Sequence, residues 1–414
     1  MAHIDVHSVA VTTSHSIQSA SSARGERRLR RISAWLLLFF LIQGELGAVW
    51  DREWHAFVGR DQFWTPPHTM IYSCVAGAGL IALAIVLWET LRYFRQTPGV
   101  DDDSTIRILR VFHAPLGFSV LGFGALLALA AAPLDNYWHE LYGIDVALWA
   151  PFHMMGVTGG MIGILGMVYI FASEASIERQ SKAAPRRILG FSWLEVGTIL
   201  ALASFMNFVF TGFLQFPLIT IGTLHISTYP LPLVAGGMLC LIGATRFTRK
   251  TGSALLFLFF LFLHTWIVEV FVPWAIRVAV EQQDLPYRVA GSMPYFRWDY
   301  ALLPIVFLLP ALAADLLIWR AGKTSQSTME RRYPTLYGAA VGALLSIPAF
   351  LLAPIVLQSY SEFAPVFLPE PGLAVSPILF IAAVCLSSLV GLLAGALGGF
   401  LGADLGDIWR WNTR

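Results

Sequence analysis

The stretch WDREWHAFVGRDQFWTPPHTM, residues 50–70, joins the end of one apolar run to the start of the next. A second stretch, LDNYWHELYGIDVALWAPFHMM, residues 134–155, joins a later pair of apolar runs. Seven positions agree between the two stretches, in the same order: Asp51, His55, Gly59, Asp61, Trp64, Pro66 and His68, then Asp135, His139, Gly143, Asp145, Trp149, Pro151 and His153. Each stretch predicts the turn of a two-helix hairpin, and their agreement indicates an internal repeat.

The composition indicates a protein that is solvated by lipid. Hydrophobic residues make up 57% of the 414 residues and charged residues 13%, with a mean hydropathy of +0.66. Soluble domains carry about 25% charged residues. The formal net charge of +1 gives no basis for a nucleic-acid partner. Cys74, Cys240 and Cys385 lie far apart in apolar runs, so we expect neither a disulfide framework nor a thiolate metal site.

Apolar segments long enough to cross a bilayer recur along the chain, and crossing takes about 20 residues. Ten candidates are 32–50, 68–92, 109–133, 152–174, 189–214, 228–246, 253–276, 300–320, 335–357 and 374–401. Small residues four apart at 159–166 and 391–402 predict close helix packing there. The expected fold is an all-α polytopic transmembrane bundle of about ten spans in a lipid bilayer, built partly from repeated two-helix hairpins.

The chain divides into three parts by composition. Residues 1–31 read as a disordered tail that ends in the basic block RGERRLRR. No small-residue cleavage site follows, so the first apolar run is expected to stay as a helix. Residues 32–250 form a first transmembrane part that contains the repeated stretches, and residues 251–414 form a second.

The distribution of positive charge predicts the orientation. With a cytoplasmic N-terminus and ten spans, both termini and most of the 27 Lys and Arg lie inside. The outer segments then contain only Arg52, Arg60, Arg277, Arg288 and Arg297. This asymmetry follows the positive-inside rule. It places both repeated stretches on the outer side, which in a bacterial inner (cytoplasmic) membrane is the periplasm.

The repeated polar residues have the spacing of ligands that meet at a helix turn. Residues four apart on a helix lie on one face, with Cβ atoms roughly 5–6 Å apart. A glycine then suits the end of the first helix, and a proline suits the start of the second. The candidate metal ligands are Asp51, His55, His68, Asp135, His139 and His153. Such a set suits copper, with zinc or iron as alternatives, and it leaves open one composite site or two.

Further polar residues are candidates for supporting roles. Asp61 and Asp145 could hydrogen-bond a liganding imidazole. Asn207 and His225 are separated by 18 residues, as Asp135 and His153 are, and they could face the same polar cavity. The position four residues after Asn207 is Thr211, so this third copy lacks a full ligand set.

Several isolated ionisable residues lie within the apolar runs. His264 and Glu269 are five residues apart and share a helix face poorly, so they are candidates only for support or a proton path. Glu45 and Glu195 also lie within spans. A hydrogen bond between helices is the simplest role for both, and lining the same cavity is the alternative. His113 lies at the other end of its span from the repeated stretches and reads as interfacial.

The spacing Asp51-x3-His55-x12-His68 resembles the metal-site motif in the C subunit of copper membrane monooxygenases, the particulate methane and ammonia monooxygenases. The second copy, Asp135, His139 and His153, has one additional residue before its last histidine. The resemblance covers about 20 residues per copy and implies copper near the outer face of a helical membrane protein. It also implies partner membrane subunits, for which a homo-oligomer is the alternative. The chain departs from that subunit in its larger number of spans, its doubled motif and Thr211.

Three functions remain open from the sequence. The first is a metal-binding membrane protein, with copper and an oxygenase-like role on a small apolar substrate. The second is a transporter or metal-handling protein, which needs a continuous polar path across the membrane. The third is a scaffold in which the repeated stretches only tie hairpins together.

Overall fold

The computed structural model describes residues 6–59, 62–97, 105–143, 150–181, 187–213, 219–221, 224–226, 231–322, 332–357 and 377–410. Ten helices within this part of the chain are long and apolar enough to cross a membrane. The chain is therefore a multi-pass membrane protein, and the prediction of an all-α bundle of ten spans is confirmed.

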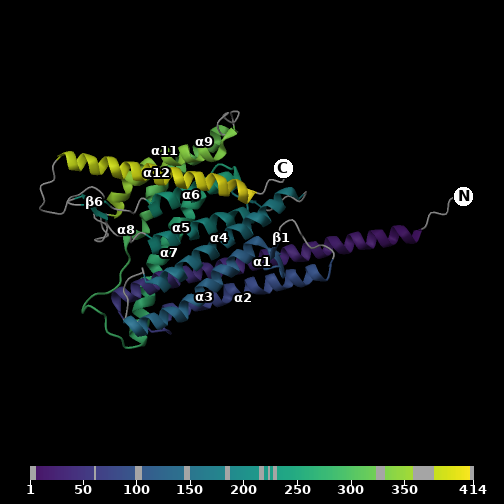
Figure 1. Ribbon diagram of the computed structural model, residues 1–414, viewed down its shortest axis with the longest axis horizontal. Coiled ribbons are helices and arrows are strands. Elements are labelled where there is room, and N and C mark those ends of the chain that lie inside the picture. Colours follow the sequence, from purple (N-terminus) through teal and green to yellow (C-terminus); the bar gives the residue numbers. More distant parts are fainter. Residues whose placement is uncertain are drawn as a thin grey trace.

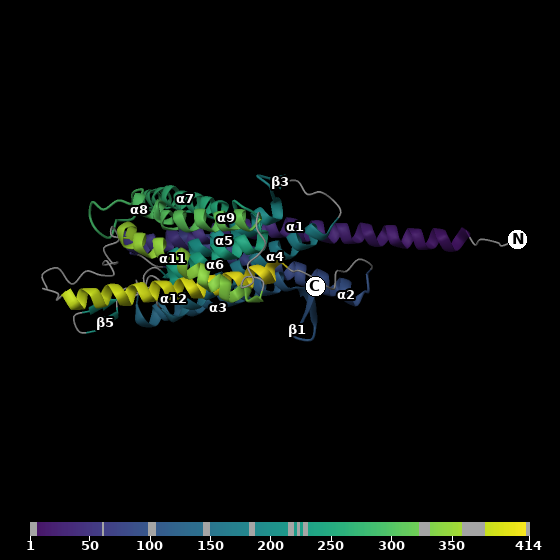
Figure 2. The same cartoon turned by 90° about the horizontal axis from the view of Figure 1, so that it is seen from above.

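The helices run roughly along one long axis (Figures 1 and 2). They are α1 (Val6–Phe57), α2 (Pro66–Phe94), α3 (Leu116–Tyr142), α4 (Pro151–Gln180), α5 (Trp193–Phe213), α6 (Gly236–Thr248), α7 (Ser253–Gln282), α8 (Trp298–Ala301), α9 (Leu308–Ala321), α11 (Pro334–Leu357) and α12 (Pro377–Arg410). A π-helical turn, η2 (Leu231–Ala235), precedes α6, and a 3-10 turn, η3 (Leu303–Phe307), precedes α9.

Three short antiparallel hairpins lie in the connections. They are β1 (Thr105–Ile108) with β2 (Phe112–Pro115), β3 (Arg187–Ile188) with β4 (Phe191–Ser192), and β5 (Ile219–Ile221) with β6 (Leu224–Ile226). The first two lie at the end of the bundle where α1 enters, and the third lies at the other end (Figures 1 and 2). We call this other end, where α1 ends and α2 begins, the triad end, because the two predicted groups of one aspartate and two histidines, here called triads, lie at helix turns there.

Glycines bring neighbouring helices into contact at both predicted small-residue segments. A Cβ on Gly159 of α4 would lie 2.7 Å from the backbone nitrogen of Ala128 and 2.7 Å from the carbonyl oxygen of Gly124, both on α3. On α12, a Cβ on Gly399 would collide with the Gly338 carbonyl oxygen of α11. Close backbone approach is how helices pack when lipid and side chains are equally apolar. The prediction of packed faces at 159–166 and 391–402 is confirmed.

Large apolar side chains cover the outside of the bundle. Phe39 is 63% exposed, Leu80 66%, Leu126 60% and Leu351 55%. The interior holds an apolar cluster to which α1, α4, α5, α6 and α7 contribute. A second, smaller cluster at the triad end joins α1 to α7 around Trp54, Val272 and Tyr300. An apolar exterior around an apolar core is the arrangement that a bilayer requires.

The eighth span and the N-terminal region differ from the sequence prediction. The expected continuous span 300–320 is divided into α8, η3 and α9, and Pro304 lies at the start of the 3-10 turn. Proline cannot donate a backbone hydrogen bond, so it interrupts regular α-helix. The structure has α1 from Val6 onward, where the sequence predicts a disordered tail over residues 1–31.

Ion pairs explain why the basic block is part of a helix. Arg30 is 2% exposed, and its guanidinium contacts Glu26 on the preceding turn at 2.5 Å and Glu89 of α2 at 3.0 Å. Arg31 contacts Glu174 of α4 at 3.0 Å. The pair of Glu26 and Arg30 follows from helical spacing, because residues four apart share a face. The pairs with Glu89 and Glu174 join residues far apart in the sequence, so no local spacing predicts them.

We predict that Gly159→Ala destabilises the bundle, because the new methyl group would overlap the α3 backbone. The expected loss is about 1–3 kcal/mol in the free energy of unfolding, measured in mixed micelles. The matched control is Gly163→Ala, one turn further along α4, where the nearest atom to an added Cβ is Leu41 Cδ2 at 3.9 Å. That variant should keep or slightly raise stability, since alanine favours helix over glycine. Equal effects of the two changes would contradict the proposed contact.

Candidate metal centre

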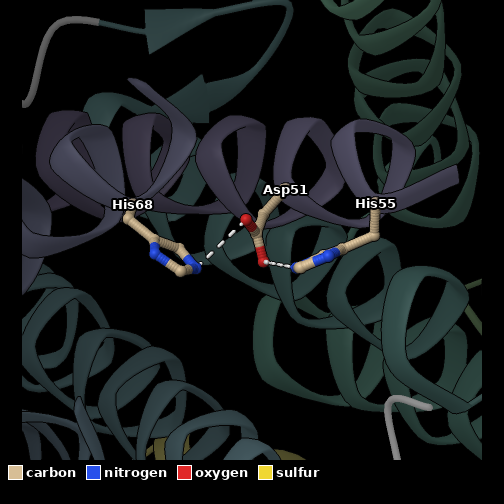
Figure 3. Close-up of side chains that lie close together, drawn as sticks. All are labelled: Asp51, His55 and His68. Atoms are coloured by element: carbon tan, nitrogen blue, oxygen red, sulfur yellow. Dashed lines mark ion pairs between the residues drawn. The ribbon is translucent and has the colours of Figure 1, made fainter. Parts of the chain in front are cut away.

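The first triad gathers Asp51, His55 and His68 at the turn between α1 and α2. The Asp51 carboxylate lies between the two imidazoles (Figure 3). Its Oδ2 atom is 3.7 Å from His55 Nε2, and its Oδ1 atom is 3.2 Å from His68 Nε2. One ligand atom from each residue lies within 4.8 Å of the others. The sequence prediction that these three residues meet is confirmed.

Local structure on both sides of the turn sets this geometry. Helix α1 continues to Phe57, so Asp51 and His55 share one of its faces. Gly59, with φ of +70°, follows the helix end. The Thr65 side chain accepts a hydrogen bond from the backbone N–H of His68 at 3.3 Å and so caps α2. Pro66 stands at the start of α2, where its missing N–H costs nothing.

The second triad gathers Asp135, His139 and His153 at the turn between α3 and α4. The Oδ2 atom of Asp135 is 3.5 Å from His139 Nε2 and 3.1 Å from His153 Nε2. Gly143, with φ of +84°, ends α3 and donates its N–H to the His139 carbonyl oxygen at 3.0 Å. Two triads of the same composition therefore lie at two helix turns; the internal repeat itself stays a prediction.

Both triads are shielded from solvent but not closed to it. The exposed fraction of the six side chains lies between 9% for His55 and 19% for Asp51. Within the described part of the chain, no hydrogen-bond donor reaches the buried Oδ1 atom of Asp135. A buried carboxylate oxygen without a donor is costly, which makes this atom a suitable ligand for a cation.

Backbone carbonyls hold one imidazole of each triad. His68 Nδ1 is 3.0 Å from the Gln62 carbonyl oxygen, and His139 Nδ1 is 3.2 Å from the Gly143 carbonyl oxygen. A carbonyl can only accept, so each Nδ1 carries the proton and donates. In a neutral imidazole, Nε2 then presents its lone pair towards the aspartate oxygen. Two electron pairs facing each other require a positive charge between them, either a second proton on the imidazole or a metal ion.

The separations of the donor atoms match those around a metal ion. Ligands bound at about 2.0–2.1 Å lie roughly 3.4 Å apart at a tetrahedral angle. In the second triad one oxygen, Asp135 Oδ2, lies 3.5 Å and 3.1 Å from the two imidazole nitrogens, which agrees with this value. In the first triad the distances of 3.7 Å and 3.2 Å run to the two different oxygens of Asp51. Each triad supplies three ligand atoms, so a four-coordinate ion would keep one open position. Each of the two groups could therefore hold a metal ion.

The two triads form separate groups among the described residues, where they are the two clusters of at least three His, Cys, Asp or Glu residues with ligand spacing. Each is built from its own hairpin. Of the two arrangements that the sequence left open, one composite site or two, this geometry fits two sites.

The predicted supporting residues either lie outside the described part of the chain or face another group than the triads. Asp61 and Asp145 lie outside the described residues, as does the His225 side chain, although the backbone of His225 pairs with Thr220 between β6 and β5. Asn207 is 0% exposed on α5 and faces Glu45 of α1, not the triads. The support that sequence reasoning missed is the pair of carbonyls of Gln62 and Gly143. The signal for Gly143 was its position four residues after His139, at a helix end that favours glycine.

Comparison of the chain with models of known protein families, with curated proteins and with solved structures finds no match. Functional conclusions therefore rest on the residues of this chain and on their geometry.

We predict that Thr65→Ala destabilises the first triad's hairpin by about 1 kcal/mol, because the α2 cap at His68 is lost. The measurement is the free energy of unfolding, together with amide exchange at the first turn of α2. Thr65→Ser keeps the capping oxygen and serves as the control. Faster exchange in the alanine variant alone is expected; an unchanged exchange rate would show that the cap does not hold His68.

Proposed function

We propose that this membrane protein binds one metal ion in each of the two Asp/His/His triads, that the metal is copper, and that its role is oxygenase-like. The observation that carries the proposal concerns His68 and His139: the Nε2 atom of each approaches an aspartate oxygen, at 3.2 Å and 3.5 Å, while its Nδ1 atom donates to a backbone carbonyl. This arrangement requires a positive charge beside each aspartate, which a bound metal ion would supply, and ligand spacing that suits such an ion is present in both triads.

Copper is the favoured metal for two reasons. A carboxylate with two imidazoles suits copper, and the intrinsic affinity order of divalent ions places copper highest. The spacing of Asp51, His55 and His68 also resembles that of the copper site in the C subunit of copper membrane monooxygenases. Zinc and iron accept the same donors, so the metal test below includes both.

In this function the residues of the chain would bind the metal ion and orient the imidazole rings that hold it. The aspartate and two histidines of each triad hold the ion, and the carbonyls of Gln62 and Gly143 fix the orientation of one ring in each. Copper supplies redox chemistry with dioxygen when it is bound. The apolar exterior of the bundle suits a small apolar substrate that arrives from the membrane.

The positive-inside distribution supports an outer, periplasmic position for the triad end. Both termini then lie in the cytoplasm. An ion taken up from the outer solution would reach the triads directly, because their side chains are partly exposed.

The transporter alternative requires a polar path through the bundle to the opposite end. Apolar residues fill the interior between α1, α5 and α7 on that side, among them Leu38, Leu41 and Leu261, with exposures of 2%, 8% and 0%. This apolar layer favours the metalloprotein over alternating access.

We predict that the purified chain takes up two copper ions, one in each triad. A substitution in one triad should remove the ion from that triad and leave the ion in the other. His55→Ala and His139→Ala should each retain one equivalent, and the double variant none, by elemental analysis and electron paramagnetic resonance after incubation with copper, zinc or iron. His113→Ala is the control, because His113 stacks on Tyr93 outside both triads. Loss of both ions in either single variant would contradict two separate sites, and an unloaded wild type would refute metal binding.

We also predict that the copper-loaded chain, with a chemical reductant, consumes dioxygen, because each ion keeps an open position. Consumption should fall at least tenfold in the double variant, equivalent to about 1.4 kcal/mol in the barrier. The measurement is oxygen uptake in nanodiscs with a small alkane present and absent. Copper binding without oxygen uptake would reject the oxygenase role and leave a metal-handling protein.

A further inference from the structure

A second polar cluster, separate from both triads, lies deep between α1, α5 and α7. The carboxyl group of Glu45 accepts a hydrogen bond from the Ser204 hydroxyl through Oε1, and its Oε2 atom is 3.0 Å from His264 Nε2. Asn207, one turn after Ser204 on α5, faces the same carboxyl group. All four residues are at most 5% exposed. Neither polar atom of the Asn207 side chain makes a hydrogen bond with well-formed geometry among the described residues.

Charge decides what this cluster could bind. Glu45 is the only carboxylate in it, and the groups that face Glu45 are His264 from α7, Cys74 from α2, and Ser204 and Asn207 from α5. One proton shared by a carboxylate and an imidazole leaves the pair neutral. A divalent ion in the same place would leave one net positive charge deep in a medium of low dielectric constant, which is costly. The cluster therefore suits a proton better than a metal ion.

Polar side chains continue from this cluster towards the triad end. On α5, Ser204, Asn207 and Thr211 occupy one face by helical spacing, and the Tyr300 phenol lies beside Thr211. The Arg52 guanidinium carbon is 6.0 Å from the centre of the Tyr300 ring. The result is a column of polar groups that leads outward from Glu45.

The column ends at charged groups of the triad end that are partly exposed or buried close to the exposed ones. Arg52 contacts Glu53 at 2.7 Å, and Glu269 accepts a hydrogen bond from the backbone N–H of Arg297 at 2.8 Å. Glu53, Glu269 and Arg297 line a small surface pocket between α1, α7 and the segment before α8. Arg52, Glu53 and Arg297 have side chains that are 18%, 17% and 27% exposed, so water reaches this end of the column and can exchange protons there.

The opposite side of the cluster is closed by apolar residues. One turn further from the triad end, α1, α5 and α7 present Leu41, Ala201 and Leu261, which are 8%, 0% and 0% exposed. The next turn adds Leu38 and Phe257, and all five belong to the main apolar core. Hydrocarbon side chains offer no hydrogen bonds, so a proton has no relay through this layer.

We infer that Glu45 and His264 form a proton-binding site inside the membrane that exchanges its proton with water through the polar column at the triad end. The proton comes from water on that side and returns to it. No redox step is involved, and the site does not depend on whether the triads hold metal.

The test is an infrared difference spectrum of the metal-free full chain in nanodiscs, recorded between acidic and alkaline solution. The wild type should show a carboxyl C=O band that is lost on the alkaline side, and Glu45→Gln should abolish it. The matched control is Glu195→Gln, since Glu195 is also buried but lies outside the cluster and is paired with Lys250 at 2.5 Å; this variant should keep the band. A wild type without such a band, or a band that survives in Glu45→Gln, overturns the inference.

Two further variants test the pair and the column. His264→Gln should keep the carboxyl band at alkaline pH, because no imidazole remains to share the proton; an unchanged titration would overturn the pairing. Asn207→Leu should slow deuterium exchange of the band about tenfold, and an unchanged rate would overturn the proposed access path. Elemental analysis of Glu45→Gln after copper loading separates this site from the triads: loss of a copper equivalent would identify a metal site in place of a proton site.

Discussion

The constraint on which the structure depends is that lipid offers no hydrogen bonds. Every backbone group within a span must then be satisfied by its own helix, which accounts for ten helical spans. Buried hydroxyl groups such as that of Thr198 can bond to a carbonyl of their own helix, but buried charged side chains find partners on neighbouring helices. Arg30 meets Glu89, and Asp315 accepts hydrogen bonds from the backbone N–H groups of Ala254 and Leu255. Buried charged residues therefore mark the places where helices are locked together.

The same constraint separates the two kinds of polar site. The triads lie at helix turns of the triad end, where the chain leaves its helices and backbone carbonyls become available to hold imidazoles. Glu45 and His264 lie within helices whose carbonyls are already used, so side chains from α5 complete their surroundings. Partial exposure suits a site that takes up an ion, and complete burial suits one that binds a proton.

Glycines allow the helices that carry the polar sites to approach one another closely. Gly124 and Gly159 bring α3 and α4 together along the hairpin that carries the second triad. Near Glu45, a Cβ on Gly44 would overlap the Cys74 side chain, so α1 and α2 also approach closely next to the first triad's hairpin. Close packing at small residues far from the turns thus helps to position the two triads.

The sequence by itself determined the ten spans, the hairpin turns and the membership of both triads, because a helix repeats every 3.6 residues and a short turn brings its two ends together. Only the tertiary structure decided which residue faces which across helices. Asn207 faces Glu45, 162 positions away in the chain, and the carbonyls of Gln62 and Gly143 hold one imidazole in each triad. Rotation and register between helices follow from packing along their whole length, which no local pattern encodes.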